Sequence, residues 1–179
     1  MKCLHVTLQE DWRGVCALNP LEKVLPVFHG VQSAQRLIEA ARACYSIGYK
    51  TFIASRVLGA AAQQGIPELH RIAYKMQRNL LIVKDLPEVV ELLSPKALYL
   101  AVPPQSGVAA EPLPLEEVKA ATTQGEAIAI AFSGGEPGFS RRELELGKPV
   151  VIVNRPLDGL GLLIAAMFKV AVQLEASTL

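Results

Sequence analysis

Short apolar runs alternate with segments of helical periodicity along most of this chain. The apolar runs predict six β-strands, at residues 24–28, 51–55, 80–83, 97–102, 127–132 and 150–153. Helices are expected between the Ser33 cap and the Gly48 stop, after Pro67, and at residues 87–93, 115–121 and 160–175. This order predicts an α/β fold, with a mainly parallel six-stranded sheet and helices on both faces.

The first residues fit this pattern worst. Residues 1–21 are expected to be an N-terminal extension, or an extra edge strand at residues 5–8, which leaves residues 22–179 as the domain. The first ten residues have no apolar run typical of a secretory signal. Lys169 interrupts the longest apolar stretch, so no membrane span is expected and the predicted compartment is the cytoplasm.

Composition narrows the function classes. Hydrophobic residues make up 51% of the chain and charged residues 20%, which is enough apolar material for a core. The formal net charge is only +1, so an RNA-binding face has to be a local patch. The cysteines (Cys3, Cys16 and Cys44) and the three histidines lack paired ligand spacing, so neither disulfides nor a metal site is expected.

Three loops rich in glycine, proline and polar residues follow predicted strands, at residues 103–107, 133–140 and 154–161. Open α/β sheets bind ligands at the carboxyl ends of their strands, so these loops are candidate binding segments. Ser140 is placed to cap a short helix, with Glu143 as its capping-box partner. Taken singly, each loop is a weak signal: the loops at residues 133–140 and 154–161 are also explained as ordinary capped turns, and residues 103–107 are better explained as a plain loop.

Together the loops resemble the motifs of the SPOUT class of RNA methyltransferases, the α/β-knot or SpoU-like family. Residues 128–140, a hydrophobic strand followed by a Gly/Glu/Gly turn and a serine, resemble its second motif. Residues 151–163 are similar to the third motif, and residues 42–48 to the end of the first. The chain looks most like the small archaeal members of uncertain function that are little more than the knotted domain.

The resemblance implies a trefoil knot formed by the chain from about residue 127 onward. It also implies an S-adenosylmethionine-dependent RNA methyltransferase acting on tRNA or rRNA. Separately, residues 160–175 are apolar on more sides than one small domain can bury, which predicts a symmetric homodimer through this helix, with residues 37–45 as a second candidate contact. Arg42 is the implied catalytic residue, and Arg36, Arg141 and Arg142 are the implied RNA contacts. The implied cofactor residues are Val102, Pro103, Gly107, Phe132, Ser133, Gly134, Gly135, Glu136, Gly138, Ile152, Asn154, Leu157 and Leu160.

The chain departs from the family pattern at two motifs. Arg36 and Ile38 stand where the first motif has Asn and Gly, and Gly159 and Gly161 stand where the third usually has Ser and Asn. A non-catalytic cofactor- or RNA-binding protein therefore remains an alternative, and Arg42 is otherwise a surface residue. A metal-dependent nuclease is the less favoured alternative, because the core strands are almost free of Asp and Glu.

Overall fold

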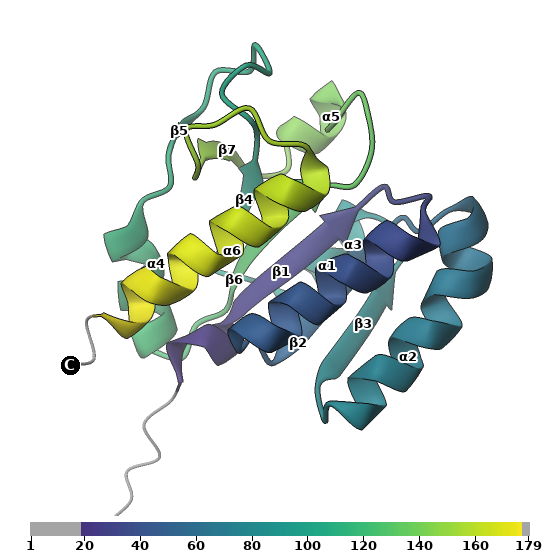
Figure 1. Ribbon diagram of the computed structural model, residues 1–179. Coiled ribbons are helices and arrows are strands. Elements are labelled where there is room, and N and C mark those ends of the chain that lie inside the picture. The colour runs from purple at the N-terminus through teal and green to yellow at the C-terminus, as the bar shows by residue number, and fades with distance from the viewer. Residues whose placement is uncertain (1–18, 177–179) are drawn as a thin grey trace, which may run out of the picture.

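A computed structural model describes residues 19–176 and shows one parallel sheet with helices on both faces (Figure 1). The sheet has seven strands in the order β3-β2-β1-β6-β4-β7-β5, and every pair of neighbours is parallel. The strands are β1 (Val24–His29), β2 (Thr51–Ser55), β3 (Asn79–Val83), β4 (Ala97–Ala101), β5 (Glu111–Pro112), β6 (Ile128–Ser133) and β7 (Lys148–Val151).

The helices divide between the two faces of the sheet. One face is covered by α1 (Ala34–Ile47), α2 (Ile66–Lys75), α4 (Leu115–Thr123) and α6 (Gly159–Glu175), whose buried residues pack with those of the strands in the larger core cluster. The other face is covered by α3 (Leu86–Leu93) and the short α5 (Arg141–Leu144). A 3₁₀ turn at Pro20–Lys23 precedes β1, and a π-helical turn at Ala61–Gly65 leads into α2.

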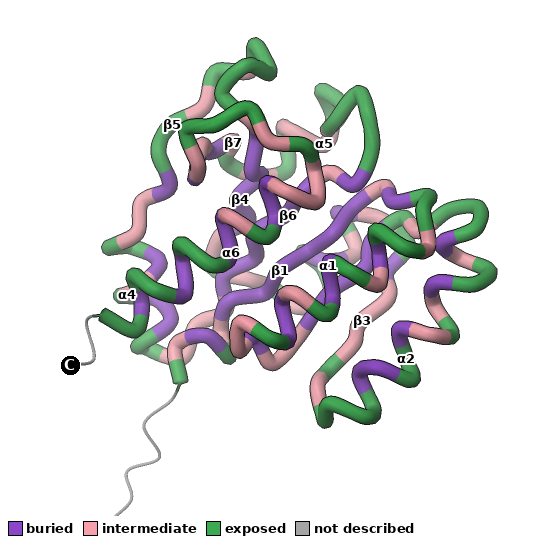
Figure 2. Tube along the Cα trace, in the orientation of Figure 1, coloured by how far each residue is buried: buried purple, intermediate pink, exposed green. Residues whose placement is uncertain are grey.

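The central strands are apolar on both sides because both of their faces are covered. In β6, Ile128, Ile130 and Phe132 face the larger cluster, whereas Ala129 and Ala131 face the smaller one. This alternation follows the two-residue period of a strand. Figure 2 shows the buried trace running through β1 and β6, with exposure increasing toward the outer helices.

Local signals in the sequence set most helix ends. The side chain of Ser33 accepts a hydrogen bond from Arg36 N, and Gly48 ends α1 with φ 123°. Ser140 and Glu143 form the expected capping box at α5, and Asp158 caps α6. Cys44 is buried, as expected of a small apolar residue.

The expected strand count of six was wrong, because β5 is a seventh strand. Its two exposed residues pair with Val150 and Val151 of β7 at the edge of the sheet, and so short a polar segment has no apolar run to reveal it. The last main strand also begins earlier than expected, at Lys148, and its pairing with β4 ends at Val150.

Within residues 19–176, no helix is long and apolar enough to cross a membrane. The possible edge strand at residues 5–8, together with Cys3 and Cys16, lies outside the described residues. The division into an extension and a domain stays a prediction.

Candidate functional site

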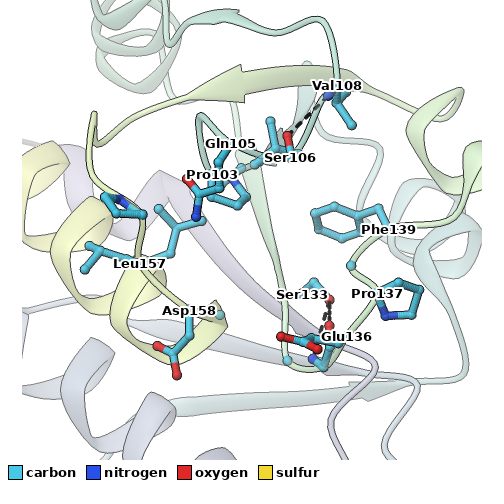
Figure 3. Close-up of a pocket in the computed structure, with 18 of the residues that line it drawn as sticks. Pro103, Gln105, Ser106, Val108, Ser133, Glu136, Pro137, Phe139, Leu157 and Asp158 are labelled. Atoms are coloured by element: carbon cyan, nitrogen blue, oxygen red, sulfur yellow. Dashed lines mark hydrogen bonds between the residues drawn. The ribbon is translucent and has the colours of Figure 1, made fainter.

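A cavity of about 670 Å³ opens at the carboxyl ends of β4, β6 and β7. Three loops line it, and they are the three that the sequence analysis singled out: the segment after β4, residues 133–140 after β6, and the loop before α6 (Figure 3). Because the three strands are parallel, their following loops meet at one edge of the sheet. We call this cavity the loop pocket, and residues 133–140 the glycine loop.

The glycine loop turns sharply and bonds to itself. The Ser133 hydroxyl donates to the carbonyl of Gly135 at 2.8 Å, and Gly138 N donates to the same carbonyl at 3.1 Å. A Cβ on Gly134 would lie 2.9 Å from the Cβ of Val31, so no larger residue fits there without a shift. Gly138 has φ 96°, which favours glycine.

The loop before α6 brings the start of that helix against β6. The side chain of Asp158 accepts a hydrogen bond from Gly161 N at 2.9 Å and lies 3.6 Å from the Arg36 guanidinium. Gly159 packs directly on the main chain of Ser133, where a Cβ would overlap the carbonyl oxygen. The third motif therefore has glycine at position 159 for a steric reason.

The remaining wall comes from the segment after β4. Ser106 N donates to the carbonyl of Pro103 at 3.0 Å, which makes this segment a turn. Figure 3 shows Pro103 and Leu157 on one side of the pocket and Phe139 on the other. The apolar walls suit the flat faces of an aromatic ligand, and the polar edges of such a ligand can meet backbone groups.

The loop pocket carries three charged side chains, those of Arg36, Glu136 and Asp158. The Asp158 carboxylate is engaged by the helix cap and by Arg36. Among the described residues, no hydrogen bond or ion pair engages the Glu136 carboxylate. Figure 3 shows this carboxylate in the space between the glycine loop and the loop before α6. Glu136 is therefore the carboxylate best placed to act on a bound ligand.

The structure brings together eight of the cofactor residues implied by the resemblance. The pocket lining includes Val102, Pro103, Ser133, Gly134, Gly135, Glu136, Gly138 and Leu157. It does not include Gly107, Phe132, Ile152, Asn154 or Leu160. Phe132 and Ile152 are buried in the core instead, because their side chains point to a helix-covered face of the sheet.

The implied RNA-contacting and catalytic arginines are spread out. Arg36 lines the pocket, whereas Arg141 and Arg142 lie on α5 outside it. Arg42 faces α2, where its guanidinium lies 3.7 Å from the Glu68 carboxylate in an exposed pair. Arg42 is therefore a surface residue, which was the alternative interpretation, and it does not line the pocket.

Seven further lining residues belong to the three predicted loops without having been named as cofactor residues: Gln105, Ser106, Pro137, Phe139, Pro156, Asp158 and Gly159. Sequence reasoning missed four lining residues outside these loops, which are Ala101, Val108, Leu144 and Leu162. Ala101, Val108 and Leu162 lie within two residues of a predicted loop, so the loop positions were the available signal. Leu144 is different, because only the return of α5 to the sheet brings it to the pocket.

His29, the last residue of β1, lies beside the glycine loop. Its Nε2 atom is 2.8 Å from Glu143 Oε1, and its Nδ1 atom is 3.0 Å from Ser55 Oγ. Burial lowers the pKa of His29, and the hydrogen bond to Glu143 opposes this shift without reversing it. Burial alone would raise the pKa of Glu143, but hydrogen bonds from Ser140 and His29 outweigh it and hold that pKa below its usual value.

Metal-binding side chains are sparse in the described part of the chain. Within residues 19–176, no three of the His, Cys, Asp and Glu side chains group closely enough to hold a metal ion. The two carboxylates of the loop pocket do not converge either, because Asp158 turns toward Arg36. These residues therefore do not form a carboxylate cluster of the kind that two-metal nucleases use.

Comparison with known proteins gives a family model and two curated relatives that are named for nucleases. The model of a family described as RecB-family nuclease (DUF2122) matches residues 59–174. A protein of Aeropyrum pernix, provisionally named type II restriction enzyme ApeKORF2002P, is 36% identical over 124 residues, which cover 69% of this chain and 75% of that protein. A similarly named protein of Methanocaldococcus jannaschii, MjaORF1200P, is 29% identical over 84% of this chain and 98% of its own length.

The solved structures that resemble this one carry the SPOUT-like fold. A probable methyltransferase of Bordetella pertussis has a TM-score of 0.68 at 15% identity, covering 87% of this chain and 98% of that chain. The TrmH/SpoU tRNA modifying enzyme of A. aeolicus has a TM-score of 0.60 at 11% identity, covering 90% and 82%. At these identities the likeness establishes the fold, which confirms the SPOUT-like architecture expected from the sequence.

The expected activity is corrected by the same comparisons. The family model and both curated relatives are nucleases by description, so the prediction of an S-adenosylmethionine-dependent RNA methyltransferase was wrong. The lack of carboxylates in the core strands made a nuclease the less favoured alternative, but the acidic side chains of the pocket, Glu136 and Asp158, lie on its loops.

Proposed function

Because this chain belongs to the RecB-family nuclease family (DUF2122), we propose that it acts on nucleic acid and takes one nucleotide unit into the loop pocket. The observation that carries this proposal is the pocket itself, where three strand-end loops enclose about 670 Å³ between apolar walls. A nucleobase has flat apolar faces and polar edges, which suits walls such as Pro103, Leu157 and Phe139. Arg36, half-exposed at the pocket, can contact phosphate.

The proposed reaction is hydrolysis of a phosphodiester bond. In this step a water oxygen bonds to phosphorus, the P–O ester bond breaks, and the leaving oxygen gains a proton. Glu136 is the proposed base that takes a proton from the water, because the other pocket carboxylate, Asp158, is already occupied as a helix cap. The family and the names of the curated relatives support the reaction class.

Oligonucleotide assays test this proposal. The full chain is mixed with end-labelled single- and double-stranded DNA and RNA, with Mg²⁺ or with EDTA. Binding is followed by fluorescence anisotropy and cleavage by denaturing electrophoresis. We expect Leu157→Glu, which places a negative charge in the pocket wall, to weaken binding by at least about tenfold, about 1.4 kcal/mol. Arg71→Gln, at an exposed position of α2, makes the same change in net charge away from the pocket and is the matched control. Failure of the parent protein to bind any of the four substrates would refute the proposal.

We propose S-adenosylmethionine, the cofactor implied by the resemblance, only as a molecule that binds in the loop pocket. S-adenosylmethionine carries an adenine ring, and eight of the residues implied for it line the cavity. This proposal includes no methyl transfer. Isothermal titration calorimetry of the full chain with S-adenosylmethionine tests it, with Leu157→Glu as the blocked variant. Absence of heat with the parent protein would rule the ligand out.

We also propose that the protein forms a symmetric homodimer through α6. Ile164, Phe168 and Val172 recur every four residues and form an exposed apolar stripe, with Phe168 60% exposed. Such a stripe on a long helix suits a self-complementary interface.

The trefoil knot implied by the resemblance is likewise a proposal, supported by the fold that this chain shares with the TrmH/SpoU tRNA modifying enzyme of A. aeolicus. An experimental structure whose C-terminal segment is not threaded through a loop would refute the knot.

A further inference from the structure

His29 contacts the glycine loop and the helix that follows it at three places. Its carbonyl oxygen accepts a hydrogen bond of 2.7 Å from Gly134 N, at the start of the loop. Its ring stacks on Phe139, near the end of the loop, with centroids 6.1 Å apart. Its Nε2 atom bonds to Glu143 in α5. One residue of β1 therefore contacts both ends of the segment that forms a wall of the loop pocket.

The other side of the imidazole ring is anchored in the sheet. The carboxylate of Glu143 can only accept, so His29 Nε2 donates to it. The Nδ1 atom of the neutral ring then accepts from the Ser55 hydroxyl at 3.0 Å. Ser55, His29 and Glu143 stand in the order of a catalytic triad, but Ser55 is fully buried and no substrate reaches it. This arrangement therefore serves a structural purpose.

Glu143 connects several parts of the chain. Its Oε1 atom accepts from His29 and, at 3.3 Å, from Arg56, while its Oε2 atom accepts from Ser140 N at 2.7 Å. Helix α5 has four residues and none of them is buried. These polar contacts and the partial packing of Phe139 and Leu144 hold α5 to the sheet.

We infer that His29 is a positioning residue, whose hydrogen bond to Glu143 holds the glycine loop in the shape that binds a ligand in the loop pocket. His29 itself lies outside the pocket lining, and its effect on ligand binding rests on the proposed function. When the hydrogen bond is lost, the loop opens more often in the free protein. Ligand affinity falls with it, because binding then has to restore the order of the loop.

The groups around His29 are consistent with a neutral imidazole that donates a hydrogen bond. Burial lowers the pKa of the ring and is the largest effect. Arg56 lowers the pKa further, whereas Glu143 and Asp85 raise it without cancelling the effect of burial. A neutral ring with its proton on Nε2 satisfies Glu143 and Ser55 together. Nitrogen-15 spectra of the imidazole ring report this tautomer directly and are independent of any ligand.

Hydrogen exchange with matched variants tests the inference. Glu143→Ala removes the hydrogen-bond acceptor from α5 and leaves the hydrophobic core unchanged. His29→Gln replaces the imidazole donor with an amide on a side chain of different shape. Glu145→Ala, which removes the same charge from an exposed carboxylate at the C-terminal end of α5, is the control. Amide exchange at residues 134–140 is measured in the free proteins, and anisotropy with a labelled single-stranded DNA oligonucleotide gives the affinity.

We expect amide exchange in the glycine loop to speed up by about tenfold in both test variants, because each variant loses the hydrogen bond between His29 and the charged Glu143 carboxylate. Oligonucleotide affinity should fall by a similar factor, and the control should match the parent. Unchanged exchange in Glu143→Ala would overturn the inference, as would faster exchange with undiminished affinity. If the parent protein binds no oligonucleotide, the proposed function fails, while the exchange data still decide whether His29 holds the loop.

Discussion

Gly159, the first residue of α6, packs so closely on Ser133, the last residue of β6, that a Cβ at position 159 would overlap the Ser133 carbonyl oxygen. This contact joins two segments that the sequence separates by 26 residues (159 − 133). It sets the position of the α6 N-terminus at the loop pocket, and with it the positions of Asp158 and Leu157.

Replacing Gly159 by alanine should therefore destabilise the protein. The obstructing atom is main chain and cannot rotate away, so we expect a loss of at least about 2 kcal/mol in the free energy of unfolding, within the range for overpacked sites. Urea denaturation followed by circular dichroism measures it. Gly161→Ala is the control in the same helical turn, because its Cβ would meet side-chain atoms of Asp158 and Leu157 and no main chain. Equal stability of the two variants would contradict the prediction.

Arg36 and Arg42 lie on the same helix but should differ in function. Arg36 lines the loop pocket, whereas Arg42 pairs with Glu68 toward α2. We expect Arg36→Ala to weaken oligonucleotide binding and to reduce the slope of log affinity against log salt by about 1, as for one lost phosphate contact. Arg42→Ala should leave both unchanged. Anisotropy titrations at several salt concentrations make the comparison, and a larger loss from Arg42→Ala would reverse the assignment.

Glu136 should matter for cleavage more than for binding. The change Glu136→Gln keeps the shape of the side chain and removes its ability to take a proton, so we expect oligonucleotide cleavage to fall by about 100-fold or more with affinity nearly unchanged. Single-turnover cleavage assays measure the rate. Glu145→Gln, at the exposed end of α5, serves as the control. Full activity of Glu136→Gln would remove this residue from the proposed mechanism.

The apolar stripe on α6 should control assembly. Phe168→Glu places a charge in the centre of the proposed interface, so we expect it to yield monomers where the parent forms dimers. Light scattering coupled to gel filtration measures the mass. Tyr74→Glu makes the same kind of change on α2, where the side chain is 87% exposed, and should leave the mass unchanged. A monomeric parent at micromolar concentration would refute the dimer.

Acid should destabilise the contacts between His29 and Glu143. Both groups have lowered pKa values in the folded protein, so the unfolded chain binds more protons as pH falls. The His29 contribution is complete above its ordinary pKa of 6.5 and is lost as pH falls through the lowered folded value. The Glu143 contribution is complete above 4.5 and is lost in the same way. Urea unfolding at several pH values should show that the free energy of unfolding declines less steeply below pH 6.5 for His29→Gln than for the parent. The same decline with pH in both proteins would argue against a lowered pKa at His29.

The sequence by itself determined the local structure and the class of fold. Apolar runs with two-sided burial mark β1, β2, β4 and β6, and the capping signals at Ser33, Ser140 and Asp158 act within a few residues of the chain. The three strand-end loops could be expected to meet because parallel strands end at one edge of a sheet. Such features depend on neighbours in the chain or on a simple topological rule, and a sequence records both.

Only the tertiary structure decided which side chains face the loop pocket. The edge strand β5 has no apolar pattern of its own and exists through pairing with β7. His29 reaches Glu143 across 114 residues, Arg42 turns toward α2, and Leu144 returns to the pocket with α5. These arrangements depend on the relative orientation of elements far apart in the chain. Packing of the whole core sets that orientation, and no single segment encodes it.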